Sequence, residues 1–139
     1  MARFRFRMQR LLDHRRYLEK SAKEAWMLKR AEKLAGEEEL ELMKQKRRSL
    51  ASETVSDFPQ LVQQQHALSR MESLEKAFLA ALAILANEEE AAYRVWMDRK
   101  KDAEAIDKLR EKALDLWEKE QEKKEQAALD EWAVMRRTA

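Results

Sequence analysis

Side chains that could support catalysis or bind a metal are few and scattered in this chain of 139 residues. The chain has no cysteine, which excludes disulfides and thiolate metal ligands. His14 and His66 are far apart in the sequence, and neither has an acidic neighbour at ligand spacing. Catalysis needs groups preorganised in a cleft that excludes water, whereas the carboxylates here fall on charged helical faces. We therefore predict no catalytic residue, no metal site and no cofactor.

The basic side chains near the N-terminus favour contact with an acidic partner. Arg3, Arg5 and Arg7 alternate with Phe4 and Phe6. Such a pattern could bind nucleic acid, because arginines pair with phosphates and aromatic rings stack on bases. The rest of the chain is net acidic and would repel a long polyanion, so we predict no nucleic-acid partner.

Four tryptophans are many for a chain with 7% aromatic residues. Trp26 and Trp96 are expected to pack where helices cross, with the indole N–H at the rim. Trp132 is equally compatible with packing and with anchoring in a partner's pocket, because tryptophan is enriched at binding hot spots.

Composition predicts long helices rather than a thick globular core. Charged residues make up 40% of the chain, hydrophobic residues 45%, and there is one glycine and one proline. Such a composition is typical of coiled coils. The sequence therefore predicts an all-α fold, a long antiparallel two-helix coiled coil in the form of a helical hairpin.

No segment is apolar enough to cross a membrane. The longest apolar run, 77–86, is much shorter than the roughly 20 residues that a spanning helix needs. The basic N-terminus is not followed by the apolar stretch of a signal peptide. We expect a cytoplasmic protein.

The element boundaries follow from the few residues that break helices. We expect one domain over residues 1–139, with a helix at about 4–50, a turn at about 51–59, a short helix at about 60–75 and a helix at about 76–136. Ser56 or Asp57 should cap the second half, with Pro59 in its first turn. A single turn would place Arg3 near residue 110 and leave the C-terminal stretch overhanging. We favour the alternative, in which the short extra helix at the tip brings both termini side by side.

Apolar residues at steps of three and four predict the seam of the coiled coil. The pattern slips near residues 25–28 and turns polar after Leu116, so pairing should weaken there. Gly36 is expected to be a tolerated helical glycine, with a bend as the alternative. The predicted seam residues are Leu18, Ala22, Ala25, Phe78, Ala81, Leu85, Ala92, Val95, Ile106, Leu109 and Ala113.

Three stretches resemble the FliJ family of the bacterial flagellar export apparatus. They are the N-terminal residues 4–13, the Leu-Glu-Lys-Ala segment at 74–77, and the C-terminal residues 108–112 with 130–136. The resemblance covers nearly the whole chain in the expected order.

The resemblance implies a stalk-like coiled coil that binds a hexameric FliI-type ATPase, promotes its activity, contacts the cytoplasmic domain of a FlhA-type export gate and escorts export chaperones. It implies a non-enzymatic protein that meets the inner membrane only peripherally, through its partners. The expected ATPase-binding residues are Arg3, Phe4, Arg5, Phe6, Arg7, Leu11, Arg15, Leu116, Trp132 and Arg136. The expected gate-binding residues are Met43, Leu50, Met71, Leu74 and Ala77, of which Leu74 and Ala77 rest on a motif match and the others on position.

Two alternatives remain open at this point. One is the equivalent stalk of a virulence injectisome, which neighbouring genes would distinguish. The other is a structural coiled coil that associates with itself, which sedimentation would distinguish.

Overall fold

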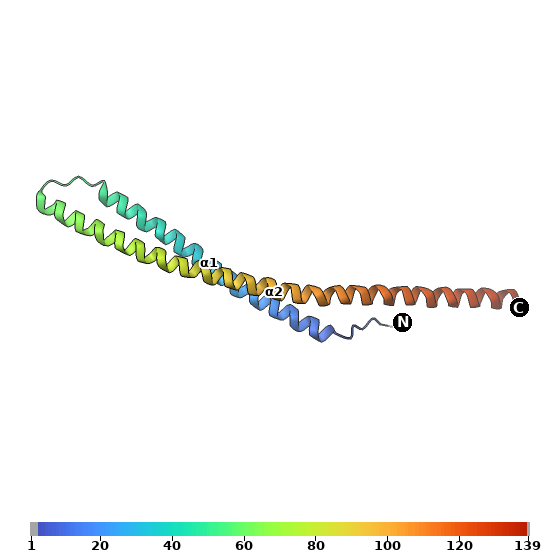
Figure 1. Cartoon of the computed structure of the whole chain (residues 1–139). Helices are drawn as coiled ribbons and strands as arrows, with labels where there is room; N and C mark the ends of the chain where they lie inside the picture. The colour runs from blue at the N-terminus through green and yellow to red at the C-terminus, as the bar shows by residue number, and fades with distance from the viewer. Residues whose placement is uncertain (1–2, 139) are drawn as a thin grey trace. The chain divides into compact units, whose positions relative to one another are not determined.

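The computed structural model describes residues 3–138, which form two α-helices joined by a turn (Figure 1). Helix α1 spans Gln9–Ala51 and helix α2 spans Phe58–Thr138, with 43 and 81 residues. The described residues contain no strand. The all-α helical hairpin predicted from the sequence is confirmed. The expected single domain 1–139 includes residues 1, 2 and 139, which lie outside the described part of the chain, and it stays a prediction.

Helix α1 begins five residues later than expected. Residues 3–6 are not helical, and the backbone N–H of Gln9 donates to the carbonyl of Phe6 over 3.2 Å. Cations at a helix N-terminus are disfavoured by the helix dipole, and Arg3, Arg5 and Arg7 would all fall there if α1 began at residue 4. The arginine-rich segment is therefore extended rather than helical.

The turn covers residues 52–57 and has a capped exit. The N–H of Gln60 donates to the Asp57 carboxylate over 2.9 Å, as expected for an N-cap residue, and Pro59 lies in the first turn of α2. On the entry side, the Gln64 amide donates to the carbonyls of Leu50 and Glu53 over 2.7 and 3.2 Å. The Leu50 carbonyl also accepts from the Glu53 N–H over 3.2 Å, so these bonds hold Gln64 of α2 to the end of α1 and the turn.

The expected short helix at 60–75 is not a separate element. Helix α2 is continuous from Phe58, so the predicted boundary at residue 76 is wrong. The polar run Gln63–His66 has a weak apolar face, which suggested a break, but none of its residues interrupts a helix. The carbonyl bonds of Gln64 instead attach this run to the end of α1.

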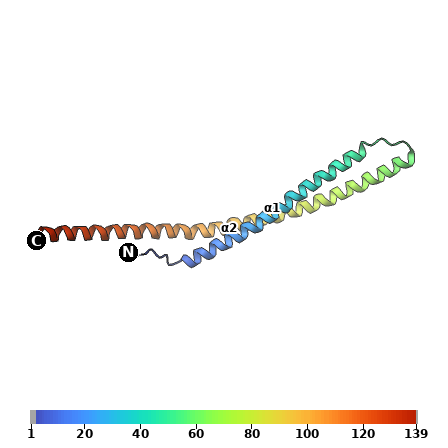
Figure 2. The same cartoon turned by 180° about the vertical axis from the view of Figure 1, so that it is seen from behind.

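The chain forms two compact units, each built from part of α1 and part of α2. We call residues 3–20 with 97–138 the terminal unit, and Ser21–Trp96 the turn unit. Within the turn unit the two helices run antiparallel and side by side from the turn onward, in both views (Figure 2).

Burial in the turn unit alternates at steps of three and four along both helices, as in a coiled coil. The buried or half-buried positions that follow this pattern on α1 are Ala22, Trp26, Lys29, Lys33, Gly36, Leu40, Met43, Arg47 and Leu50, and the half-buried Lys44 lies beside them. Those on α2 include Met71, Glu75, Phe78, Leu82, Leu85, Glu89, Ala92 and Trp96. The phase does not slip near residues 25–28, because Trp26 and Lys29 occupy seam positions there.

Burial coincides with the predicted seam at every seventh residue of α2 and is shifted from it in between. Phe78, Leu85, Ala92, Ile106 and Ala113 are buried or half-buried, and so are Leu18 and Ala22 on α1. Ala25, Ala81, Val95 and Leu109 are exposed. The half-buried residues of α2 lie one position later than Ala81, Val95 and Leu109, at Leu82, Trp96 and Arg110. Polar and aromatic side chains fill part of the seam, so the apolar pattern alone pointed to a neighbouring stripe.

Gly36 lies inside α1 and at a packed position. It is buried in the seam, and a Cβ placed on it would lie 2.5 Å from Cδ2 of Leu82. The glycine therefore provides the room into which Leu82 of α2 packs.

The terminal unit ends in an unpaired length of α2. Phe4 packs on Trp117, with ring centroids 5.8 Å apart. Gln121 is the last half-buried residue, and each of residues 122–138 is exposed. The structure thus shows the single-turn arrangement, in which the C-terminal stretch extends past the N-terminal segment, and the favoured side-by-side termini are wrong. We call residues 118–138 the C-terminal arm.

Candidate interaction surfaces

Five ion pairs join the two helices in the same direction, with the cation on α1 and the carboxylate on α2. In the terminal unit, Arg15 and Arg16 reach Asp102 and Asp107 at 3.1 and 2.8 Å. In the turn unit, the pairs are Lys29–Glu88 at 3.0 Å, Lys33–Glu89 at 3.9 Å and Arg47–Glu75 at 2.9 Å. This sorting of charge favours pairing of α1 with α2 over pairing of either helix with its like.

The pairs differ in how far water reaches them. The side chains of Arg47 and Glu75 are 30% and 11% exposed, so this pair is part of the packed seam. Lys29 is solvated, and its hydrogen bond to Glu88, together with the charges of Glu32 and Glu88, raises the pKa of its ammonium group above 10.5. Exposed pairs contribute little to stability, whereas a buried charge that loses its partner is costly.

An aromatic cluster replaces aliphatic packing at one end of the turn unit. Trp26 stacks on Trp96 with centroids 5.0 Å apart, and Tyr93 meets both rings at 5.7 and 5.8 Å. The Trp26 indole N–H donates to Glu89 over 2.9 Å. The packing role expected for Trp26 and Trp96 is confirmed, but the indole nitrogen of Trp96 is buried and does not lie at the rim.

The N-terminal segment is held on α2 by a smaller set of contacts in the terminal unit. Phe4 lies between Trp117 and the guanidinium of Arg110, whose carbon is 5.5 Å from the ring centroid. The Arg110 Nε donates to the Gln9 side chain over 3.1 Å. Phe4 is therefore a packing residue that attaches the extended segment to the long helix.

The arginines of this segment surround a hollow without an acidic neighbour. The hollow has a volume of about 460 Å³ and is lined by Arg3, Phe4, Arg5, Phe6, Arg7, Gln9, Arg10 and Arg110. Arg3, Arg5, Arg7 and Arg10 are exposed. Guanidinium groups gathered in this way favour a carboxylate- or phosphate-bearing partner.

The C-terminal arm carries apolar side chains that nothing in the described chain covers. Leu129, Trp132 and Met135 are 60%, 57% and 68% exposed, and helical spacing places them with Ala128 on one face. The Arg136 guanidinium lies 4.7 Å from the centroid of the Trp132 ring. All ten residues expected to bind the ATPase lie in the terminal unit, and seven of them are exposed.

A second apolar surface runs along one side of the turn unit. On α2, Leu74, Ala77, Ala81 and Ile84 are exposed at steps of three and four, one position before the seam. Leu28, Ala35 and Leu42 form the corresponding exposed row on α1. Glu32 continues the row on α1, and Glu88 continues the row on α2. Lys29 contacts both glutamates, so the two rows lie on the same side of the hairpin. We call them together the apolar flank.

The apolar flank separates the expected gate-binding residues into two groups. Leu74 is 60% exposed and Ala77 is exposed, and both lie on the flank. Met43, Leu50 and Met71 are half-buried at seam positions, where they pack the helices together. The two residues chosen from the sequence motif are accessible, and the three chosen by position belong to the seam. A heptad frame that places Trp26 and Gly36 in the seam would have distinguished the two exposed residues from the three seam residues.

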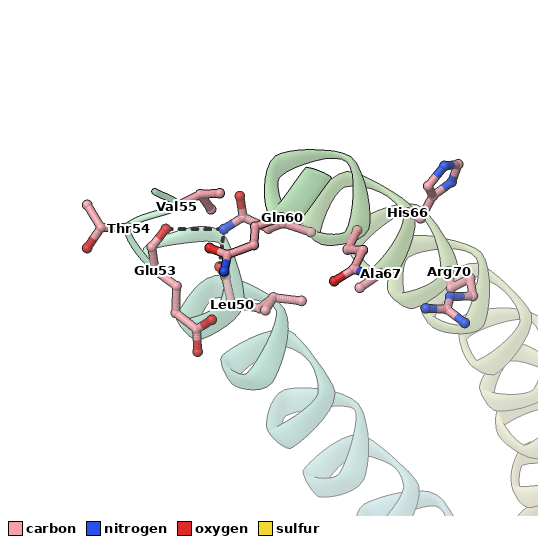
Figure 3. A pocket seen from close by; sticks show the side chains of 10 residues that line it. Leu50, Glu53, Thr54, Val55, Gln60, His66, Ala67 and Arg70 are labelled. Carbon is pink, nitrogen blue, oxygen red and sulfur yellow. Dashed lines mark hydrogen bonds between the residues drawn. The ribbon is translucent and has the colours of Figure 1, made fainter. Parts of the chain in front are cut away.

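The hollow at the turn, of about 680 Å³, is lined by both polar and apolar side chains (Figure 3). His66 and Arg70 project from α2 on one side of it, and Glu53, Thr54 and Val55 come from the turn (Figure 3). His66 and His14 are both exposed. Over residues 3–138, no group of three or more histidine, aspartate or glutamate side chains could hold a metal ion. No helix among these residues is long and apolar enough to span a membrane.

The class of protein is thus an all-α helical hairpin whose apolar side chains lie largely on exposed faces. A family model described as Flagellar FliJ protein matches residues 4–138, and the chain belongs to this family. It is accordingly a component of the flagellar export apparatus. No curated protein and no solved structure gives a significant match.

Proposed function

We propose that this protein is a non-enzymatic, stalk-like subunit of flagellar export that joins a hexameric FliI-type ATPase to a FlhA-type export gate. The terminal unit binds the ATPase, and the apolar flank of the turn unit binds the cytoplasmic domain of the gate. Through these contacts it promotes ATP hydrolysis and escorts export chaperones, and it acts in the cytoplasm, peripheral to the inner membrane.

The bare C-terminal arm is the observation that supports this proposal most. A single helix that exposes leucine, tryptophan and methionine on one face has no partner within its own unit. A partner that encloses it would bury these side chains, and tryptophan is a frequent anchor at such sites. The basic N-terminal segment beside the same helix adds electrostatic steering toward an acidic lining.

Two leucines of equal exposure allow a test with internal controls. Leu129 on the arm and Leu74 on the flank are both 60% exposed, so replacing either by alanine should leave the fold intact. We expect Leu129→Ala combined with Trp132→Ala to weaken binding to the purified ATPase and to reduce the stimulation of ATP hydrolysis. Leu74→Ala should weaken binding to the gate domain and leave the ATPase response unchanged.

The proposal is contradicted if the arm variant stimulates the ATPase as the natural chain does, or if the unaltered chain neither binds nor stimulates it at low salt. Reversing Arg3, Arg5 and Arg7 to glutamate tests the steering. Association with the ATPase should become slower and less sensitive to salt, while helicity measured by circular dichroism stays the same.

A further inference from the structure

The row of exposed side chains on α2 within the apolar flank is self-complementary. It reads Arg70, Leu74, Ala77, Ala81, Ile84 and Glu88, at steps of four, three, four, three and four. This spacing is the same in both directions. When the row is laid antiparallel against a copy of itself, centred at Leu79, Arg70 meets Glu88, Leu74 meets Ile84 and Ala77 meets Ala81.

We infer that the apolar flank is an antiparallel dimer interface in which α2 of one chain packs against α2 of a second copy. A two-fold axis at residue 79 makes the interface isologous, so each contact occurs twice. The alanines at the centre let the helix axes approach closely, and the larger Leu74 and Ile84 fill the next layer.

Charge complementarity selects a second copy over other occupants of this surface. Arg70 makes no ion pair with another described residue, and it lies at one end of the apolar row. Glu88, which pairs with Lys29 through Oε2 and has a side chain that is 47% exposed, lies at the other end. The two residues are about 27 Å apart along one helix and cannot meet within a chain. In the antiparallel pair each Arg70 faces the partner copy's carboxylate.

The composition of α2 around the centre supports the same inference. Residues 77–86 are apolar on every face, and a helix of that kind is normally buried. Of these ten residues only Phe78, Leu82, Leu85 and Ala86 are half-buried, while Ile84 on the flank is 60% exposed. One hairpin covers one side of this segment, and a second copy supplies cover for the next side.

The dimer would hide Leu74 and Ala77. This consequence alone rests on the proposed function: the free, gate-binding form is then the monomer, and self-association competes with gate binding. The dimer itself is measured on the purified chain without any partner, so its failure and the failure of the proposed function are distinguishable.

Disulfide trapping in the full-length chain tests the interface, because the natural sequence has no cysteine. We expect a mixture of the Leu74→Cys and Ile84→Cys proteins to form a mixed disulfide under mild oxidation. Either protein alone should form little, because in the antiparallel pair two copies of residue 74 are about 15 Å apart along the axis. Met27→Cys, on an exposed α1 position outside the flank, is the control in both mixtures.

Charge reversal provides an independent test by sedimentation. The average mass should rise with concentration from the 16.6 kDa of one chain toward twice that value. Arg70→Glu should weaken dimerisation by roughly tenfold, because two attractions become two repulsions. Glu88→Arg should do the same, and the double reversal should restore the dimer. Circular dichroism checks that each variant keeps its helices, since Glu88 also contacts Lys29.

Three outcomes would overturn the inference. The chain could remain monomeric at all concentrations, which would leave the flank to a different partner. It could form a dimer without the mixed disulfide, which would place the interface elsewhere. The double reversal could also fail to restore the dimer while the helices remain intact, which would show that Arg70 and Glu88 do not meet.

Discussion

The two units of this hairpin use apolar side chains in opposite ways. In the terminal unit, Leu12, Ala103 and Ile106 are buried in the seam, and Leu12 is fully buried. In the turn unit, Leu40 is the only hydrophobic side chain of that burial class among the described residues, and Lys29, Lys33 and Arg47 take seam positions beside it. Leu28, Leu42 and Leu74 of the turn unit lie instead on the exposed flank.

The difference shows that the seam and the outer surface have separate tasks. A thin apolar seam holds a short α1 segment on the long helix in the terminal unit. In the turn unit the two helices are long enough for ion pairs and aromatic rings to fill part of the seam, and apolar side chains are available to a partner. A substitution should therefore have different effects on stability in the two units.

The largest effect on stability is expected at Leu12. Leu12→Ala should lower the free energy of unfolding by about 2–5 kcal/mol, because it leaves a cavity in the fully buried part of the terminal unit. Leu11→Ala is the matched control, since the neighbouring Leu11 is 40% exposed and should cost much less. Urea unfolding followed by circular dichroism measures both. Equal losses would show that the two side chains do not differ in packing.

The next effect tests the polar seam of the turn unit. Glu75→Ala should cost about 1–3 kcal/mol, because Arg47 would remain partly buried without its carboxylate. Replacing both residues by apolar ones, Arg47→Met with Glu75→Leu, should recover this loss. Asp102→Ala, which breaks the more exposed pair with Arg15, is the control and should cost less than about 1 kcal/mol. If the double replacement stays destabilised, the ion pair is not interchangeable with apolar packing.

Substitutions at Gly36 test how closely α1 and α2 pack at a single buried position of the turn unit. Gly36→Leu should lower stability by about 1–3 kcal/mol, because the seam has no room beside Leu82. Gly36→Ala should be close to neutral, since the helical gain of roughly 1 kcal/mol is offset by the displacement of a flexible leucine end. Thermal unfolding distinguishes these results. A clear stabilisation by both variants would mean that α1 and α2 approach less closely here.

The smallest effect concerns pH. Because the pKa of Lys29 is raised in the folded chain, its pair with Glu88 contributes fully below the ordinary value of 10.5. The contribution is lost as the pH rises through the folded-state pKa. The difference in melting temperature between the natural chain and Lys29→Gln should therefore shrink above pH 10.5. A difference that is constant across this range would show that the charge of Lys29 does not matter.

The sequence was sufficient for the fold class, the place of the turn and a cap at Ser56 or Asp57, because proline and capping residues act locally. It was not sufficient to predict which residues form the seam. Residues such as Trp26, Lys29 and Arg47 pack through rings and methylene stems, and their polar atoms are satisfied by acidic residues about 30 to 60 positions away. Apolar periodicity does not detect such distant polar partners. It therefore predicted Ala25, Ala81 and Val95, which are exposed, as seam residues.

The accessible interaction residues were predicted only where a motif supported them. Leu74 and Ala77 come from a recognisable segment and are exposed, whereas Met43, Leu50 and Met71 were chosen by position and pack in the seam. To predict the unpaired arm, one would have to know that α2 continues through residue 75, and no single residue in that region indicates this.

The one-way sorting of cations and carboxylates also determines how the turn unit responds to shear. If α1 slid along α2 by one heptad, Lys29, Lys33 and Arg47 would each leave a carboxylate, and residues seven positions away from those carboxylates are apolar. They are Ala81 and Val95 for Glu88, Leu82 and Trp96 for Glu89, and Leu68 and Leu82 for Glu75. No neighbouring register replaces the lost pairs, so a pull along the helix axes meets resistance in both directions.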